Sequence, residues 1–312
     1  EKQCKRSNNK TSTQILEQPK MKILVTGALG YIGTQFIYNM RDVGHTLMCI
    51  DSSKKSLEQR LGIALEYNKN VIFKKYDILD DLSIFKDVDM VLHLAAKVGY
   101  VTCDEEPEET HRTNIEGVKN ICSMQKPTVF LSTGSVYGKL DQPCVEGLEC
   151  NPATLYAKTK LQGEHIVKDL LKEYAILRPA TAYGLSFKTR HNLLIHTLCH
   201  DAVKGGRIDL YQPDAKRTFY HVNDLANTIK HTVCNFDQWK GETFNVGSTL
   251  LNITKRGIIE EIQKYIDVDV NIVEDEDKDQ RDYYVDYSKQ EAIFKSERPL
   301  DIENIIKYYQ GQ

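Results

Sequence analysis

The sequence predicts an α/β fold, with a doubly wound parallel Rossmann sheet followed by a smaller α/β lobe that binds substrate. In the first 180 residues of this 312-residue chain, apolar strand-like runs alternate with segments of helical periodicity. That alternation is typical of a parallel sheet with helices on both faces. One junction, MKILVTGALGYIG at residues 21–33, passes from an apolar run through three glycines into a helical pattern. The last third mixes strands and helices, which indicates a lobe over a cleft at the carboxyl ends of the sheet strands.

The glycine junction is the most informative stretch of the chain. A buried strand at Lys22–Thr26 is followed by Gly27, Gly30 and Gly33, spaced GxxGxxG, and then by a helix. Glycine permits the tight turn and a close approach of backbone to phosphate, while the helix N-terminus offers N–H groups and the positive end of its dipole. The junction therefore predicts a diphosphate site.

An acid at the end of the next strand extends this site to a dinucleotide. Asp51 follows an apolar strand end 18 residues after Gly33, about where such folds place the carboxylate that binds the ribose hydroxyls. A 2′-phosphate would face that carboxylate, so we predict NAD as cofactor, although Lys54 and Lys55 leave an opening for NADP.

The remaining elements follow from the same patterns. Further strands are expected at 71–76, 90–94, 128–132, 175–177, 208–211, 243–246 and 270–273. Helices are expected within 103–126 after an initial loop, and at 153–172, 222–234, 255–266 and 288–294, with 52–69 partly helical and 274–279 a charged loop. We thus expect a tail or linker at 1–20, an NAD-binding domain at 21–180 and a substrate lobe at 181–312, some of whose strands return to the first domain.

Composition excludes several classes of protein. The net charge is −3 with both signs interspersed, which gives no sign of nucleic acid or an anionic membrane as partner. No apolar run approaches the ~20 residues that span a bilayer, and the first 20 residues lack the apolar core of a secretory signal. None of the eight cysteines forms a CxxC pair, which predicts reduced thiols in a cytoplasmic protein without a metal site. A Cys144–Cys150 bridge is the alternative.

A tyrosine and a lysine at helical spacing carry the predicted chemistry. Tyr156 and Lys160 share one helix face, and an ammonium beside a phenol favours the phenolate. Lowering a tyrosine pKa toward neutrality takes about 3 units, or about 4 kcal/mol, which the lysine, a nicotinamide cation and partial desolvation together supply. Thr133 adds a hydroxyl at a strand end beside the cofactor cleft. Such a set removes a proton from the hydroxyl of a sugar or an alcohol while hydride leaves the same carbon.

At this point the chain resembles the extended short-chain dehydrogenase/reductase family, the NAD-dependent nucleotide-sugar epimerases and dehydratases. The resemblance lies in eight elements in matching order: TGALGYIG, Asp51, Asp77-Ile78, LAA at 94–96, STGSVYG at 132–138, YAKTK at 156–160, LRPATAYG at 177–184 and RTFYHVNDLA at 217–226. They run from Met21 nearly to the end of the chain.

The resemblance implies roles for individual residues. Catalysis is assigned to Thr133, Tyr156 and Lys160. Cofactor binding is assigned to Gly27, Gly30, Tyr31, Ile32, Gly33, Asp51, Asp77, Ile78, Leu94, Ala95 and Ala96, with Tyr156 and Lys160. Substrate contacts or their support are assigned to Asn114, Thr181, Arg190, His191, Arg217 and Arg281, the last two at the diphosphate. A homodimer through helices near 104–124 and 153–172 is also implied.

Some of these residues have plainer alternatives. Arg217 and Arg281 could equally form surface ion pairs, and His191 could be structural. Cys103, after the fourth strand, is either a reactive thiol or a bystander, and the bystander is the commoner case.

Departures from the family pattern reduce the number of reactions that the resemblance allows. Gly134 and Ser135 stand where dehydrating members carry an Asp-Glu pair and decarboxylating members a glutamate, and the cysteine of 3,5-epimerases is absent. Thr181 replaces the usual asparagine. What remains is oxidation at C4 of a GDP- or UDP-linked sugar, as a 4-epimerase or a C4 dehydrogenase, with a branch acting on GDP-heptoses the most similar. A 4-keto sugar reductase and a non-catalytic dinucleotide-sensing protein are the alternatives.

Overall fold

The structure, a computed structural model, describes residues 19–53, 68–140, 142–274 and 282–312. Several predictions lie outside these residues. They concern the tail up to residue 18, most of the 52–69 segment with Lys54 and Lys55, most of the charged loop and Arg281. Among the described residues, no helix is both long and apolar enough to cross a membrane.

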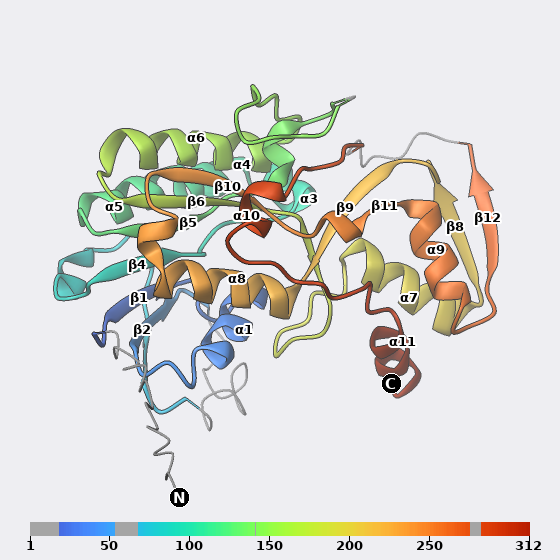
Figure 1. Cartoon of the computed structure of the whole chain (residues 1–312), viewed down its shortest axis with the longest axis horizontal. Coiled ribbons are helices and arrows are strands. Elements are labelled where there is room, and N and C mark those ends of the chain that lie inside the picture. Colours follow the sequence, from blue (N-terminus) through green and yellow to red (C-terminus); the bar gives the residue numbers. More distant parts are fainter. Residues whose placement is uncertain (1–18, 54–67, 141, 275–281) are drawn as a thin grey trace, which may run out of the picture.

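A seven-stranded sheet forms the centre of the larger part of the molecule, in the order β10-β6-β5-β4-β1-β2-β3 (Figure 1). Every neighbouring pair in it is parallel. Its strands are β1 (Lys22–Thr26), β2 (Thr46–Asp51), β3 (Val71–Lys75), β4 (Met90–His93), β5 (Thr128–Leu131), β6 (Tyr174–Pro179) and β10 (Glu242–Val246). The chain builds outward from β1 to β3 and then resumes at β4 on the other side of β1. This reversal makes a crevice at the carboxyl ends of β1 and β4, where such sheets bind ligands.

Alternating side chains of the strands pack into two helix layers. Ile23 and Val25 of β1 face a core with α1 (Tyr31–Asn39) and α8 (Val222–Cys234), whereas Leu24 faces the opposite side. The other layer holds α3 (Tyr100–Glu105), α4 (Pro107–His111), η2 (Arg112–Glu116), α5 (Gly117–Ser123) and α6 (Leu155–Leu170) (Figure 1). The short η1 (Leu82–Phe85), η3 (Gly134–Tyr137) and η4 (Phe236–Gln238) are 3-10 turns in the connections. The predicted fold class is confirmed.

A smaller lobe lies beside the carboxyl ends of these strands (Figure 1). It contains a three-stranded sheet, β11-β9-β7, and a parallel pair of β12 with β8. Its elements are β7 (Thr181–Tyr183), α7 (Leu194–Gly205), β8 (Arg207–Tyr211), β9 (Lys216–His221), η5 (Thr249–Leu251), β11 (Asn252–Thr254), α9 (Lys255–Gln263), β12 (Asp269–Val273) and α11 (Glu303–Gln310). The small α10 (Ser288–Glu291) instead packs against β10.

The structure corrects the prediction in several places. The loop expected at the start of 103–126 is wrong, because α3 begins at Tyr100 and Pro107 then opens α4 at its first position, where proline suits a helix. Helix α6 begins at Leu155 because the Thr154 hydroxyl caps it, accepting from Ala157 N at 3.2 Å. Strands β7, β9 and β11 and helices α7 and α11 were absent from the prediction. Strand β9 is buried at all but its first position, so it lacks the alternation that marks a half-exposed strand.

Candidate active site

The glycine turn has the geometry that a diphosphate requires. Gly27 has φ of +65°, and a Cβ added to it would lie 2.7 Å from Ala95 N. A Cβ on Gly33 would lie 2.6 Å from the Gly27 carbonyl oxygen. The turn closes through Gly30 N, which donates to Gly27 O at 3.0 Å, and α1 begins directly after it. A side chain at Gly27 would collide with the segment after β4, and one at Gly33 would collide with the turn itself. Glycine therefore permits this turn, whose backbone a phosphate can approach closely.

Asp51 lies beside this turn at the end of β2. One of its carboxylate oxygens accepts from Leu29 N at 3.0 Å and the other from Ser53 N at 2.9 Å. The carboxylate is thus held in place at the outer side of the glycine turn. That is the position from which an acid binds the adenosine ribose of a dinucleotide, so these residues fit NAD.

A cavity of about 930 Å³ opens at the carboxyl ends of the sheet strands. Nine of the predicted site residues line it: Tyr31, Ile32, Leu94, Ala96, Thr133, Tyr156, Lys160, Thr181 and Arg190. Seven predicted cofactor residues do not: Gly27, Gly30, Gly33, Asp51, Asp77, Ile78 and Ala95. The same holds for Asn114, His191 and Arg217. The proposed catalytic trio therefore meets in one cavity, next to the start of α1.

The three predicted catalytic side chains come from two neighbouring elements. Thr133 follows β5, and its hydroxyl accepts from Ser135 N at 3.2 Å, which caps the turn η3. Tyr156 is half-buried in the first turn of α6, and Lys160 follows one turn later, 3% exposed. Their roles stay a prediction, but their common position on the cavity wall is what such roles require.

Burial sets the electrostatics of Lys160. Its Nζ lies 4.1 Å from the centre of the Phe130 ring. Burial lowers the pKa of Lys160 to about 7, against an opposing contribution from the Glu164 carboxylate. Burial therefore disfavours the charged form of Lys160, whereas the predicted role of stabilising a phenolate requires the ammonium. His93, on the neighbouring strand, is kept neutral, because burial and the positive charge of Lys160 lower its pKa to about 3.

Asn114 has a structural place instead of one on the cavity wall. Its amide oxygen accepts from Lys97 N at 2.8 Å, and its amide nitrogen donates to Lys97 O at 3.1 Å and to the Thr159 hydroxyl at 3.0 Å. The side chain joins the segment after β4 to helix α6, next to Lys160. Asn114 therefore helps to hold the predicted catalytic helix in position without lining the cavity.

The other predicted residues outside the cavity also have defined surroundings. His191 Nδ1 lies 2.9 Å from the Tyr309 hydroxyl, Arg217 is 3% exposed on β9, and Asp77 accepts from Leu79 N at 3.0 Å. Ile78 packs in the core on the α5 face. The contact with Tyr309 is of the kind that the structural alternative expects of His191, and its substrate contact stays a prediction.

The cysteines of the described residues are free thiols, including Cys144 and Cys150. Cys103 is fully buried, and burial raises the pKa of its thiol. A buried protonated thiol is a poor nucleophile, which favours the bystander alternative.

Several cavity residues are missing from the sequence prediction. They include Asp104, Lys139, Lys158, Asn192 and Tyr283. Asn192 adjoins the Arg190-His191 pair, and Tyr283 lies two residues after Arg281, so both are close to residues that the resemblance assigns to substrate. Lys158 lies within the YAKTK element, between Tyr156 and Lys160. Asp104 and Lys139 are charges outside the eight elements, and no pattern in the sequence marks them.

The fold and the cavity place the chain among proteins that bind a dinucleotide at a sheet switch point. Residues 23–247 match the model of the NAD dependent epimerase/dehydratase family, and the chain belongs to that family. The prediction of NAD as cofactor is confirmed by this membership.

Individual relatives agree with the family. The chain is 27% identical over 239 residues to a putative UDP-glucose 4-epimerase of Methanocaldococcus jannaschii, covering 72% of this chain and 76% of the relative. It is 29% identical over 247 residues to the uncharacterized UDP-glucose epimerase YtcB of Bacillus subtilis, covering 73% and 77%. The crystal structure of a Bacillus cereus UDP-glucuronic acid 4-epimerase with UDP-glucuronic acid and NAD superposes with a TM-score of 0.78 at 23% identity, covering 93% of this chain and 98% of the other. The last likeness supports the fold.

Proposed function

We propose that this chain catalyses the NAD-dependent epimerisation of a UDP-linked sugar at C4. The observation that carries the proposal is that Thr133, Tyr156 and Lys160 line one cavity of about 930 Å³ next to the glycine turn. UDP is proposed as the nucleotide because the relatives at 27% and 29% identity are named as UDP-glucose epimerases.

In this mechanism the chain's own residues move and hold the C4 hydroxyl proton. Tyr156 takes the proton as the general base, Thr133 donates a hydrogen bond to the same oxygen, and Lys160 stabilises the phenolate and binds the nicotinamide ribose. NAD, when bound, supplies the hydride acceptor and donor. For epimerisation the 4-keto sugar turns over within the cavity, and Tyr156 then returns the proton on the product oxygen.

The position after Thr133 argues against elimination and decarboxylation. Gly134 occupies a site where an added Cβ would lie 3.2 Å from the Pro179 carbonyl oxygen, so an acidic side chain would require the backbone to shift. Asp104 supplies the one carboxylate among the described residues that line the cavity. Dehydration of the sugar would need a base that removes the C5 proton and an acid that protonates the leaving C6 hydroxyl. The residues that follow Thr133 in the cavity wall provide neither group.

A C4 dehydrogenase and a 4-keto sugar reductase would use the same residues, and their net redox change sets them apart. The branch acting on GDP-heptoses stays a prediction. A dinucleotide-sensing protein without catalysis would have no need of the three side chains on one cavity wall.

Assembly and location complete the proposal. We propose that the chain forms a homodimer in which the exposed sides of α5 and α6 of one copy pack against those of the other. Light scattering after size-exclusion chromatography would measure the molar mass of the assembly. A cytoplasmic location stays a prediction from the cysteine pattern.

The test is product analysis over a panel of substrates. Purified protein with NAD would be incubated with UDP-glucose, UDP-glucuronate, UDP-N-acetylglucosamine and a GDP-hexose, and products would be resolved by chromatography and NMR. We expect one UDP-sugar to reach an equilibrium of C4 epimers without net NADH. Stoichiometric NADH would identify a dehydrogenase instead, and turnover with the GDP-sugar alone would overturn the choice of nucleotide.

A further inference from the structure

Helix α11, near the C-terminus, places the hydroxyl of Tyr309 behind the 190–193 segment, which contributes to the cavity wall. Tyr309, 3% exposed, places its Oη 2.9 Å from His191 Nδ1 and 3.3 Å from His196 Nδ1. The rings also meet edge to face, at 5.9 Å for His191 and 6.2 Å for His196. His191, in the segment before α7, and His196, in the first turn of α7, therefore both contact a single phenol near the end of the chain.

The donor and the acceptor of each hydrogen bond around His196 can be assigned. Its Nε2 lies 3.1 Å from the Gly184 carbonyl oxygen, which can only accept, so Nε2 carries the proton. Burial lowers the pKa of His196 to about 4, so the ring is neutral and its Nδ1 accepts from the Tyr309 hydroxyl. The Tyr309 oxygen is then free to accept from His191 Nδ1–H.

This chain of bonds ends at the cofactor turn. The Gly184 carbonyl accepts a second hydrogen bond, from the Tyr31 hydroxyl at 2.6 Å. Tyr31 is the first residue of α1 and lines the cavity, while Arg190 and Asn192 on either side of His191 line it as well. The Tyr309 hydroxyl is thus linked by hydrogen bonds to two parts of the cavity wall. It contacts the 190–193 segment through His191, and it connects to the start of α1 through His196 and the Gly184 carbonyl.

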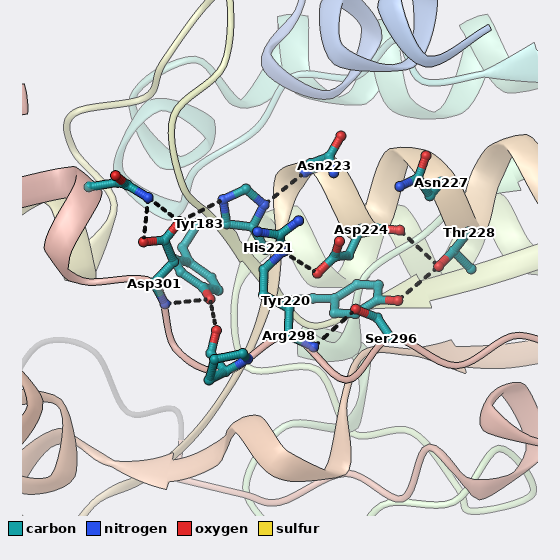
Figure 2. Close-up of polar contacts among 12 residues, drawn as sticks. Tyr183, Tyr220, His221, Asn223, Asp224, Asn227, Thr228, Ser296, Arg298 and Asp301 are labelled. Carbon is teal, nitrogen blue, oxygen red and sulfur yellow. Dashed lines mark hydrogen bonds and ion pairs between the residues drawn. The ribbon is translucent and has the colours of Figure 1, made fainter. Parts of the chain in front are cut away.

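The segment that leads into α11 is itself fastened to the rest of the molecule. Figure 2 shows Arg298 reaching Asp224 on α8 and Asp301 lying beside Tyr183 of β7. Arg298 Nε donates to the Asp224 carboxylate at 2.9 Å, and Asp301 N donates to the Tyr183 hydroxyl at 3.1 Å. The anchors fix where α11 begins, and therefore where Tyr309 can stand.

We propose that Tyr309 is a positioning residue whose hydroxyl, through His191, holds the 190–193 segment in the shape that binds the nucleotide sugar. The inference rests on the proposed function for the identity of the ligand. Tyr309 touches no substrate itself. It acts through the backbone and side chains of 190–193, so its loss weakens sugar-nucleotide binding and leaves the Tyr156 chemistry intact.

The test compares two adjacent tyrosines. Tyr309→Phe removes only the hydroxyl that joins the two histidines, and Tyr308→Phe removes that of the neighbour, whose ring stacks on His191 at 5.9 Å. Kinetics with the active UDP-sugar, calorimetric titration with UDP and that sugar, NAD titration and thermal melting would be measured for both. We expect Y309F to raise KM and the sugar-nucleotide Kd about tenfold, with kcat and the NAD Kd within twofold of wild type. Y308F should match wild type in all of them.

A second pair of variants separates positioning from folding. His191→Ala removes the donor to Tyr309, whereas His191→Asn keeps an N–H donor near the position of Nδ1. H191A should show the raised KM of Y309F and H191N should recover most of it, at unchanged melting temperatures. Equal KM values in Y309F and Y308F, or no rescue by H191N, would overturn the proposal. If no sugar turns over, the proposed function fails, while the calorimetric comparison with UDP still decides the role of Tyr309.

Discussion

Glu164 and Arg178 form a two-point ion pair inside the protein, with Nη2 to Oε2 at 2.6 Å and Nε to Oε1 at 2.9 Å. Neither side chain is more than 4% exposed. The Ser132 hydroxyl donates to the same carboxylate at 2.5 Å. Glu164 lies one helical turn after Lys160 on α6, and Arg178 lies on β6. The pair therefore fastens the proposed catalytic helix to the sheet.

Breaking this pair on one side should be costly. Glu164→Gln leaves the Arg178 guanidinium buried without a counter-charge, and we expect a loss of about 3–5 kcal/mol in the free energy of unfolding. Urea unfolding followed by circular dichroism would measure it. The double variant E164L/R178M removes both charges and should lose far less. Equal losses in the two variants would show that the cost comes from packing and not from an unpaired charge.

Lys160 should make stability depend on pH. Its folded-state pKa, about 7, lies below the unfolded value near 10.4. Below pH 7 both states hold the proton, so the full cost of burying the charge is present, and it fades as pH rises from 7 to 10.4. Lys160→Met should therefore stabilise the cofactor-free protein most at pH 6–7, by at most about 5 kcal/mol, and progressively less by pH 9.5.

The matched control for Lys160 is Lys158→Met, two residues earlier on the same helix and exposed. Its unfolding free energy should change little and should show no added pH dependence. A constant offset between K160M and wild type from pH 6 to 9.5 would mean that Lys160 titrates alike in both states.

The glycine turn should tolerate no side chain. Gly27→Ala combines a φ of +65° with a Cβ 2.7 Å from Ala95 N, so we expect at least a tenfold loss of NAD affinity and a lower melting temperature. Gly147→Ala is the control, because nothing lies within 4 Å of an added Cβ there. Calorimetric titration of NAD would compare them. An unchanged NAD affinity in G27A would contradict the proposed role of the turn.

Removing the Tyr156 hydroxyl should stop the chemistry and spare cofactor binding. Loss of a general base costs about 10²–10⁴-fold in rate, so Tyr156→Phe should lower kcat by at least 10²-fold while the NAD Kd stays within threefold. Turnover assays and NAD titration on the same preparation would check both. Normal turnover by Y156F would exclude this phenol as the base.

Asp51 should decide between the two dinucleotides. Asp51→Asn keeps an oxygen to accept from Leu29 N or Ser53 N but removes the charge that would repel a 2′-phosphate. We expect the ratio of NADP to NAD affinity to rise at least tenfold, about 1.4 kcal/mol. Asp42→Asn, at an exposed position of the surface, should leave the ratio unchanged. The same ratio in both variants would place the discrimination elsewhere.

Some parts of this site can be predicted from short stretches of sequence. A strand, three glycines and a helix are contiguous, so their backbone conformations follow from residues within a few positions of one another. The spacing of Tyr156 and Lys160 places them on one helix face by periodicity alone. Thr133 at a strand end follows the same logic, since the carboxyl ends of parallel strands meet at one edge.

Contacts between distant segments could not be inferred in this way. We expect some strands of the last third to return to the first domain, but the particular pairing of β10 with β6 depends on which surfaces of the folded chain meet. The same holds for the all-buried strand β9 and the partners of Asn114. Packing decides these contacts, and nothing in the flanking residues encodes a partner many tens of positions away. His191 is an example, because the resemblance assigns it to substrate and nothing near it in the sequence indicates its hydrogen-bond partner, which lies 118 residues onward.

The parallel α/β fold, the glycine turn and the side chains at the edge of the sheet could be predicted from short stretches of the chain, because each follows from local geometry and a fixed repeat. How the end of the chain packs behind the cavity, and which buried charges hold the proposed catalytic helix, became visible in the folded molecule alone. Those choices are made by burial and long-range pairing, where the free energy belongs to the assembled molecule and to no single stretch of it.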